Sequence, residues 1–357
     1  MINVTKTFLP PLGEYVERLA RVWDGGVITN HGPATAELEC ALRETLDAPH
    51  CLLVSNGTLA IQLAIKALGL AGEIITTPFS YVATTSSVVW EGCTPVFADV
   101  DAETLTIDPE RVEAAVTPRT SAILATHVYG HPCDVDALAD VAGRHGLRVI
   151  YDAAHCFGAR YQGRSLTTFG DVSTLSFHAT KLFHTVEGGA VVAGDADVAH
   201  RLSYMRNFGH DGPEAFQGVG INAKISELHS IMGLCVLPHI PEIVARRRGV
   251  TERYDAAIAG NACVRRPRVR AGYESNYAYY PVVYEDEAAL LRARARMNAA
   301  EIFPRRYFYP SLSKLPYITG PGMPVAENLA RRVLCLPLSA SISEADADRV
   351  AELATPA

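Results

Sequence analysis

Short apolar runs alternate with amphipathic runs along most of the chain from residue 51 onward. The compact apolar runs predict strands, and the segments between them carry apolar residues at helical spacing. Strands are expected at 51–54, 73–79, 94–100, 121–130, 147–155, 171–177 and 188–194. Helices are expected at 58–70, 81–92, 108–116, 134–146 and 197–209. This alternation is typical of βαβ units, so we predict an α/β fold with a mainly parallel sheet covered by helices.

The pattern changes toward the C-terminus. A long helical region is expected over about 225–258, and the chain becomes less regular from about residue 260. Beyond it, 273–284 is expected as a strand and 286–300 as an amphipathic helix. We therefore predict a large domain over 1–240, with an N-terminal helical segment, and a smaller C-terminal α+β domain over 241–357.

Composition narrows the class of protein. Hydrophobic residues make up 48% and charged residues 20%, as in ordinary globular enzymes, and the net charge of −7 gives no reason to expect nucleic acid. No apolar run approaches the roughly 20 residues of a membrane span, and the start lacks a signal peptide's apolar core. The eight cysteines are scattered, without a C-x-x-C pair. We expect a cytoplasmic protein with reduced thiols and no membrane association.

Polar residues follow several of the expected strands, where ligands gather in parallel α/β sheets. The turn "SNGT" (55–58) opens a helix and offers free N–H groups to a phosphate, unless it is a plain turn capped by Thr58. Asp152 ends an apolar strand and could bind a metal, a ribose or a protonated ring nitrogen, or cap a helix. His155 follows and can face the same cleft.

Lys181 lies in an unusual setting for a lysine. It is one of only five in the chain and lies between two expected strands, beside Phe177, Leu182 and Phe183. Partial desolvation would lower its pKa and make it a nucleophilic amine, whereas a flexible lysine could instead extend to solvent.

These features suggest one chemistry when they are taken together. A phosphate cradle, a strand-end carboxylate and a reactive amine are the parts that pyridoxal 5′-phosphate requires for its phosphate, its ring nitrogen and its aldehyde. Tyr81, after the next strand, is available to stack on the ring, although packing alone could explain it.

The ordered motifs resemble the DegT/DnrJ/EryC1/StrS aminotransferases, the nucleotide-sugar branch of the fold-type I enzymes that use pyridoxal phosphate. The resemblance covers nearly the whole chain, from 28 to 350, and implies a large, mainly parallel seven-stranded sheet and a smaller C-terminal domain. It is carried by "SNGTLAIQLAI", "TTPFSYVATTSSVVWEG", "PVFADVD", "YDAAHCFGA", "SFHATKLFHTVEGGAVV", "GINAKISELHSIMGL" and "LCLPL".

The resemblance assigns roles to individual residues. It implies that Lys181 forms the Schiff base, that Asp152 pairs with the pyridinium nitrogen and that Tyr81 stacks on the ring. His155 stands where many members have glutamine, beside the cofactor's 3′-oxygen, and can still donate there. The residues implied to hold the phosphate are Asn56, Gly57, Thr58 and Ser176, with Asn222 reaching the cofactor of the neighbouring subunit in a homodimer. Lys224, where many members have arginine, receives no role.

The resemblance also indicates an activity. "SFHATK" followed by "EGG" is similar to members that aminate C4 of a 4-keto-6-deoxy sugar. We therefore expect transfer of an amino group from L-glutamate to a nucleotide-linked keto sugar. The expected position is C4 of a dTDP-4-keto-6-deoxyhexose, and C3 amination is the alternative. Asn30 and Tyr309 are candidate substrate contacts, although a structural turn and a packed aromatic explain them equally. Lys181 argues against the family's dehydratase branch, in which histidine replaces the lysine.

Other classes remain as alternatives. A regulatory protein could bind the cofactor or a sugar nucleotide without turnover. A dehydrogenase would use "GVGINA" (218–223) for NAD, but this segment does not join a clear first strand to a helix. A metallohydrolase would use His127, His131 and Asp134, which fall at a strand end and turn rather than on one helix face. We expect no metal.

Overall fold

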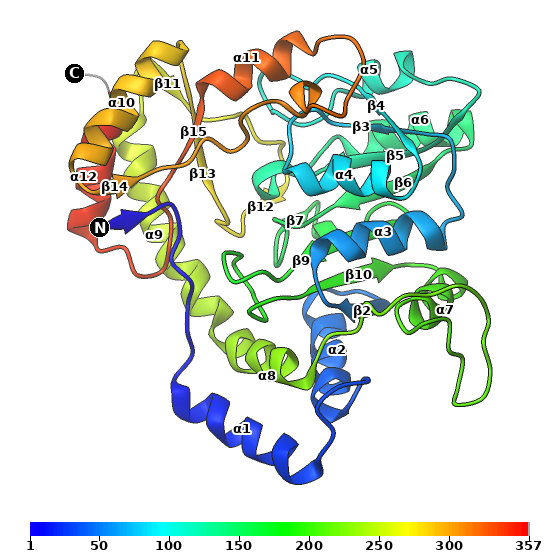
Figure 1. The fold of residues 1–357 in the computed structure, drawn as a ribbon. Helices are drawn as coiled ribbons and strands as arrows, with labels where there is room; N and C mark the ends of the chain where they lie inside the picture. Colours follow the sequence, from blue (N-terminus) through cyan, green and yellow to red (C-terminus); the bar gives the residue numbers. More distant parts are fainter. Residues whose placement is uncertain (356–357) are drawn as a thin grey trace.

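A seven-stranded sheet forms the centre of the protein in the computed structural model, which describes residues 1–355 (Figure 1). The strand order is β2-β10-β9-β6-β5-β3-β4. Strand β10 is antiparallel to both neighbours, and the other strands are parallel to one another. The predicted mainly parallel sheet is thereby confirmed. The strands are β2 (His50–Val54), β3 (Glu73–Thr76), β4 (Thr94–Phe97), β5 (Thr120–Thr126), β6 (Arg148–Asp152), β9 (Val172–Ser176) and β10 (Gly189–Ala193).

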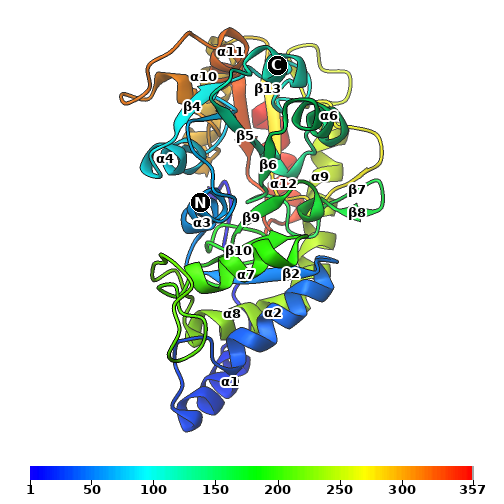
Figure 2. The ribbon, with the colours of Figure 1, turned by 90° about the vertical axis from the view of Figure 1, so that its right-hand side faces the viewer.

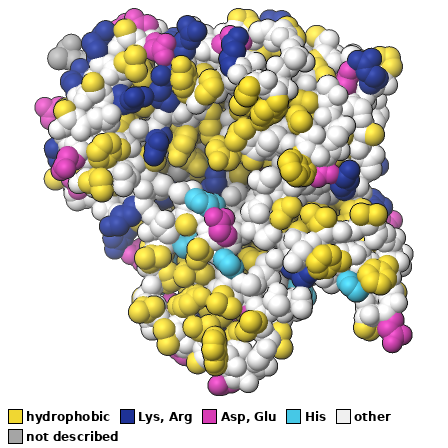
Figure 3. Space-filling model, in the orientation of Figure 1, with side chains coloured by type: hydrophobic (Ala, Val, Ile, Leu, Met, Phe, Trp, Pro, Cys, Tyr) yellow, Lys and Arg dark blue, Asp and Glu magenta, His cyan; other side chains and the backbone are white. Residues whose placement is uncertain are grey.

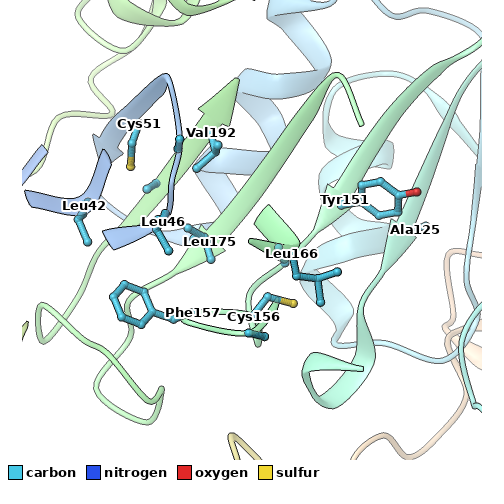
Figure 4. Close-up of a cluster of buried hydrophobic side chains, with 14 of the residues drawn as sticks. Leu42, Leu46, Cys51, Ala125, Tyr151, Cys156, Phe157, Leu166, Leu175 and Val192 are labelled. Carbon is cyan, nitrogen blue, oxygen red and sulfur yellow. The ribbon is translucent and has the colours of Figure 1, made fainter. Parts of the chain in front are cut away.

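Helices cover both faces of this sheet and bury two apolar cores (Figure 2). One face is covered by α3 (Gly57–Ala67), α4 (Val82–Trp90) and α7 (Ala196–Met205). The other is covered by α2 (Pro33–Thr45), α5 (Pro109–Ala114), α6 (Val135–His145) and α8 (Glu227–Val236). Figure 4 shows part of the second core, where Leu42 and Phe157 lie close to sheet residues such as Leu175 and Val192. Because both faces are covered, a central strand such as β10 is buried along its whole length.

The C-terminal lobe is built on a small antiparallel sheet of order β11-β13-β15. Its own apolar core lies between this sheet and three helices. The chain's first residues join this lobe, because β1 (Ile2–Asn3) pairs with β14 (Ile302–Phe303). The domain boundary at residue 240 stays a prediction. The elements are α9 (Ile240–Ile258), β11 (Val264–Arg265), β13 (Tyr280–Tyr284), α10 (Glu287–Ala299), α11 (Pro324–Arg332), β15 (Val333–Leu336) and α12 (Glu344–Ala354).

The expected strand over 273–284 is broken in the structure. Its first residues form β12 (Tyr273–Glu274), which pairs with β7 (Arg160–Tyr161) of the large lobe, itself paired with β8 (Arg164–Ser165). Its last residues form β13 in the C-terminal lobe. Between them, loop 275–279 turns with Tyr277 at a left-handed φ of 53°. The prediction was wrong here because the turn has no signal in the apolar and aromatic sequence. The turn depends instead on contacts with the large lobe, which is distant in the sequence.

A continuous helical run over Glu227–Ile258 combines α8, a short 3-10 turn and α9. By length and composition alone this run could cross a membrane, contrary to the expectation of no such segment, although a packed core helix satisfies the same criterion. Within this run, α8 packs against α2 and buries residues such as Ile231 and Leu234 in the apolar core. All eight cysteines are free thiols in the described part of the chain.

Candidate active site

The carboxyl ends of β2, β3, β5, β6 and β9 surround one pocket of about 350 Å³. Two of the strands that line it are shorter than expected. The strands predicted over 121–130 and 147–155 end at Thr126 and Asp152. The polar residues after these points turn inward instead of extending the sheet. The sequence-predicted residues that line the pocket are Asn56, Gly57, Thr58, Tyr81, Asp152, His155, Ser176 and Lys181.

Lys181 lies in the loop between β9 and β10, and its side chain is partly buried. Burial lowers its pKa to about 8, while the nearby charge of Asp152 acts in the opposite direction. Its amine donates a hydrogen bond to the hydroxyl of Tyr279 at 3.4 Å. The amine therefore faces the pocket and is partly neutral at mildly alkaline pH, as a nucleophile requires.

Asp152 ends β6, with its carboxylate buried at the base of the pocket. One oxygen accepts from the hydroxyl of Thr84 at 2.6 Å, and the other accepts from the N–H of Ala154 at 3.2 Å. Burial raises its pKa, and these hydrogen bonds and the charge of Lys181 oppose that rise. A cation that entered the pocket would further favour the carboxylate form.

A chain of hydroxyl groups leads to this carboxylate. Thr126 donates to Ser80 at 3.0 Å, and Ser80 lies 2.8 Å from Thr84. Each hydroxyl has a single hydrogen, and Thr84 gives its own to Asp152. Ser80 must then donate to Thr84, so all three hydrogens point in one direction and fix the orientation of the carboxylate.

His155 is a neutral hydrogen-bond donor toward the pocket. Its Nδ1 accepts from the N–H of Tyr129 at 3.0 Å, and burial lowers the imidazole pKa well below its usual value. The ring is held nearly parallel to Phe308, with centroids 6.0 Å apart, and against Tyr279 at 4.5 Å. Because Nδ1 is an acceptor in a neutral ring, the hydrogen is on Nε2.

The N-terminus of α3 forms an anion cradle. Asn56 caps the helix by accepting from the N–H of Leu59 at 2.9 Å. The N–H groups of Gly57 and Thr58 have no intrahelical acceptor, because they belong to the first turn of the helix. A Cβ at Gly57 would lie 2.9 Å from the Cβ of Ser176. Only glycine lets the helix end approach this serine, so N–H groups and a hydroxyl converge on one point.

Three predicted residues lie outside this pocket. Asn222 accepts a hydrogen bond from Lys224 at 2.9 Å, and Asn30 lines a separate hollow of about 190 Å³ that also contains Lys224. Asn30 has a left-handed φ of 64°, as expected of a structural turn. Tyr309 is 51% exposed in a groove next to the pocket, where the guanidinium of Arg306 lies 3.7 Å from its ring centroid.

Other lining residues were missed from the sequence. Tyr279, Tyr307 and Phe308 come from the C-terminal lobe, far along the chain from the rest of the site. His178 and Glu187 also line the pocket, with Nε2 of His178 3.6 Å from a carboxylate oxygen of Glu187. Thr84 does not line the pocket, but its hydroxyl contacts Asp152, and this residue was missed as well. Its place in the first turn of a helix that follows a strand end is the signal that could have found it.

The residues of the alternative classes do not converge on a site. His127 accepts from the N–H of Cys133 at 3.0 Å and stacks on Tyr151, whereas Asp134 caps α6 and pairs with Arg270. Within residues 1–355, no group of three or more His, Cys, Asp or Glu side chains is placed to hold a metal. The glycine-rich segment 218–223 lies between α7 and α8, not between a strand and a helix.

The seven-stranded sheet, with a lysine and a carboxylate facing one pocket at its carboxyl edge, is the architecture of fold-type I aminotransferases. Residues 13–354 match the sequence signature of the DegT/DnrJ/EryC1/StrS aminotransferase family, and the chain belongs to this family. The predicted family and fold are thereby confirmed.

Known relatives are similar over almost the full length. The chain is 40% identical to dTDP-4-amino-4,6-dideoxy-D-glucose transaminase of Shigella dysenteriae over 352 residues, which cover 96% of this chain and 95% of the relative. The Escherichia coli protein of the same name is 36% identical with the same coverage. The crystal structure of DesI in the presence of its TDP-sugar product superposes with a TM-score of 0.93 at 38% identity, covering 99% of this chain and 91% of that one. The chain is therefore an aminotransferase.

Proposed function

We propose that this aminotransferase uses pyridoxal 5′-phosphate to move an amino group from L-glutamate to C4 of a nucleotide-linked 4-keto-6-deoxy sugar. The names of the two transaminase relatives describe 4-amino sugars, and DesI was crystallised with a TDP-sugar product. The observation that carries the cofactor assignment is the placement of Lys181 and Asp152 in one pocket, beside the open N-terminus of α3.

The groups in the pocket fit this cofactor. The N–H groups of Gly57 and Thr58 and the hydroxyl of Ser176 would hold the phosphate, together with Asn56. Asp152 would keep the ring nitrogen protonated, and the Nε2–H of His155 would donate to the 3′-oxygen. When bound, pyridoxal phosphate supplies an electron sink that stabilises the negative charge left after removal of a proton from the substrate carbon.

The remaining roles fall to side chains at the pocket. Lys181 would be the amine that holds the cofactor through its aldehyde, and as a free amine it would accept and return the proton at its Nζ. A pKa of about 8 suits this task, because the neutral base and its protonated form are both accessible near neutral pH. Tyr81 is 60% exposed and would stack on the ring from the solvent side.

A groove of about 1030 Å³ adjoins the pocket and shares Ser80, Tyr81, Tyr307 and Phe308 with it. Arg294 and Arg305 line it, and within residues 1–355 neither forms an ion pair with a carboxylate. Guanidinium groups bind diphosphates through paired hydrogen bonds. We propose that this groove holds the nucleotide diphosphate, with Tyr309 in contact with it.

We propose a cytoplasmic homodimer. Helix α1 (Leu12–Gly25) has no buried residue, and its exposed apolar residues form part of the apolar area on the lower lobe in Figure 3. More exposed apolar side chains lie on the loop after α7, near Asn222 and Lys224. A second copy would cover these surfaces and let Asn222 reach the partner's cofactor phosphate. The exposed apolar residues are Leu12, Val16, Trp23, Val27, Ile28, Phe208, Phe216, Val219 and Ile221.

Two experiments test the activity. Purified protein with bound cofactor should lose its visible absorbance band in L-glutamate, and should then regain it with a 4-keto but not a 3-keto nucleotide sugar. A preference for the 3-keto sugar would favour C3 amination, and binding without any spectral change would favour a regulatory protein. Borohydride reduction should fix the cofactor to Lys181, and Lys181→Ala should lower turnover at least about 1000-fold.

A further inference from the structure

Tyr279 lies on the loop that interrupts the expected strand of the C-terminal lobe. Its hydroxyl oxygen is 3.4 Å from the Nζ of Lys181, and its ring centroid is 5.9 Å from the same atom. The ring also packs against His155 with centroids 4.5 Å apart. A residue of one lobe thus touches two site residues of the other.

Two buried side chains hold this loop in place. Asn276, which is 2% exposed, donates to the carbonyl oxygens of His155 and Phe157 at 2.8 and 2.9 Å. On the other side, Arg247 of α9 donates to the carbonyl oxygens of Tyr277 and Ala278 at 3.2 and 3.0 Å. Arg247 is itself only 3% exposed. Burying a guanidinium costs free energy unless it is hydrogen-bonded. A displaced loop would leave the buried Arg247 without these two acceptors, so the loop is held in this position.

The hydroxyl of Tyr279 differs from those of the neighbouring buried tyrosines. Tyr280, the next residue, donates to Asp255 at 2.7 Å, and Tyr284 donates to the carbonyl of Ala354 at 2.9 Å. These hydroxyls complete structural hydrogen bonds. The hydroxyl of Tyr279 meets the Lys181 amine instead, within a cluster of aromatic rings where phenylalanine would pack equally well.

We propose that Tyr279 is a positioning residue that holds the amine of Lys181 whenever that amine is not bonded to the cofactor. The proposal rests on the role of Lys181 set out above. The oxygen of Tyr279 accepts a hydrogen from the ammonium form, and its O–H donates to the lone pair of the neutral form. Burial raises the pKa of Tyr279, so the phenol keeps its proton in both cases. The hydroxyl thereby keeps the amine directed at the reacting carbon between its two uses.

The test is Tyr279→Phe in the full-length chain, freed of cofactor. Limiting acetic anhydride acetylates neutral amines, and mass spectrometry of the Lys181 peptide across pH gives the midpoint of its reactivity. The wild-type midpoint should lie near the pKa of about 8. Tyr279→Phe removes the hydrogen bond in both protonation states, but the bond to the charged ammonium is the stronger one, so the midpoint should fall by about one pH unit. In the cofactor-bound enzyme, kcat should fall about tenfold with little change in KM, because the loss concerns the proton-transfer step.

Tyr280→Phe is the matched control, since it removes the adjacent buried hydroxyl, which contacts Asp255 rather than Lys181. It should leave the labelling midpoint of Lys181 unchanged. A Tyr279→Phe midpoint equal to that of wild type would overturn the proposal. Reduction of the cofactor onto a different lysine would instead overturn the role of Lys181, so the two failures are distinguishable.

Discussion

Thr84 donates its hydroxyl to the carboxylate of Asp152 across 2.6 Å, although 68 residues separate the two in the sequence. Thr84 is fully buried on α4, and Asp152 ends β6 at the base of the pocket. The contact fixes one oxygen of the carboxylate, and the hydroxyl chain through Ser80 fixes Thr84 in turn. The orientation of the carboxylate therefore depends on a helix that the sequence motif around Asp152 does not contain.

Thr84→Val should weaken cofactor binding while it preserves the shape of the side chain at position 84. Loss of a hydrogen bond to a buried carboxylate costs about 1.5–3 kcal/mol, so the pKa of Asp152 should rise further and its pairing with the ring nitrogen should weaken. We expect cofactor affinity and kcat each to fall about 10-fold or more. Titration of cofactor-free protein by absorbance measures the first, and turnover at saturating cofactor measures the second. Thr84→Ser, which retains the hydroxyl, should restore both.

Thr85→Val is the control for this change. Thr85 is also fully buried on α4, but its hydroxyl has no hydrogen-bond partner within residues 1–355. Its replacement should leave cofactor affinity unchanged and should not lower stability, because no hydrogen bond is lost. Equal losses in the two variants would show that helix packing, not the contact with Asp152, determines affinity.

The pKa of Lys181 makes a prediction about stability. Burial lowers this pKa from 10.5 to about 8, so the folded protein binds fewer protons than the unfolded chain between these values, and stability rises with pH across this window. Below pH 8 both states are protonated and the cost of the buried charge, on the order of 3 kcal/mol, is fully present. Cofactor-free Lys181→Met should therefore be more stable than cofactor-free wild type at pH 7, and the gain should shrink between pH 8 and 10.5. Urea unfolding at pH 7 and 9.5 measures the difference, and a variant that is less stable at pH 7 would contradict the prediction.

The sequence predicted the large lobe well because its strands and helices have local causes. A short apolar run that is rich in valine and bounded by glycines, such as β10, predicts a strand buried on both faces. A glycine turn such as that at Gly57 marks the start of a helix at a strand end. These features place Asp152 and Lys181 at one edge of the sheet. Tyr279 was not predictable, since the position of its loop depends on the hydrogen bonds from Asn276 to His155 and from Arg247 to Ala278, which form only in the tertiary fold. Asn222 and Asn30 followed from the resemblance alone, and their roles stay predictions.

His155→Gln should leave cofactor affinity and turnover nearly unchanged. His155 accepts from the N–H of Tyr129 through Nδ1 and carries its hydrogen on Nε2, and a glutamine side chain offers one acceptor and one donor in similar places. His155→Leu leaves the N–H of Tyr129 without a buried acceptor and removes the donor, so cofactor affinity should fall about tenfold. Because the pKa of His155 lies well below its usual value, its titration should not appear in rate profiles between pH 6 and 7. A loss of activity in that range that His155→Gln abolishes would contradict the neutral-donor role.

Gly57→Ala should specifically weaken phosphate binding. The added Cβ would lie 2.9 Å from the Cβ of Ser176, so the helix end and the serine must separate. We expect cofactor affinity to fall at least about tenfold, since an open cradle loses hydrogen bonds to a charged group. Gly143→Ala is the control: it lies within α6, with nothing within 4 Å of the added Cβ, and should stabilise the fold by about 0.5–1 kcal/mol without altering affinity. Equal affinity for Gly57→Ala and wild type would exclude the cradle as the phosphate site.

Arg305→Gln should affect the reaction with the nucleotide sugar but not the reaction with L-glutamate. Arg305 is exposed in the groove beside the pocket and, within residues 1–355, pairs with no carboxylate. If the groove holds a diphosphate, loss of the guanidinium should raise KM for the nucleotide sugar about 10-fold while the reaction with L-glutamate keeps its rate. Arg306 is not suited to this test, because it already binds Glu287 at 2.7 Å and its loss would disturb the lobe. Arg292→Gln controls for the change in net charge, because Arg292 is exposed on α10, does not line the groove and, within residues 1–355, pairs with no carboxylate. If Arg305→Gln left the KM for the nucleotide sugar unchanged, the diphosphate would bind elsewhere. The same conclusion would follow if the rate of the glutamate reaction fell by an equal factor.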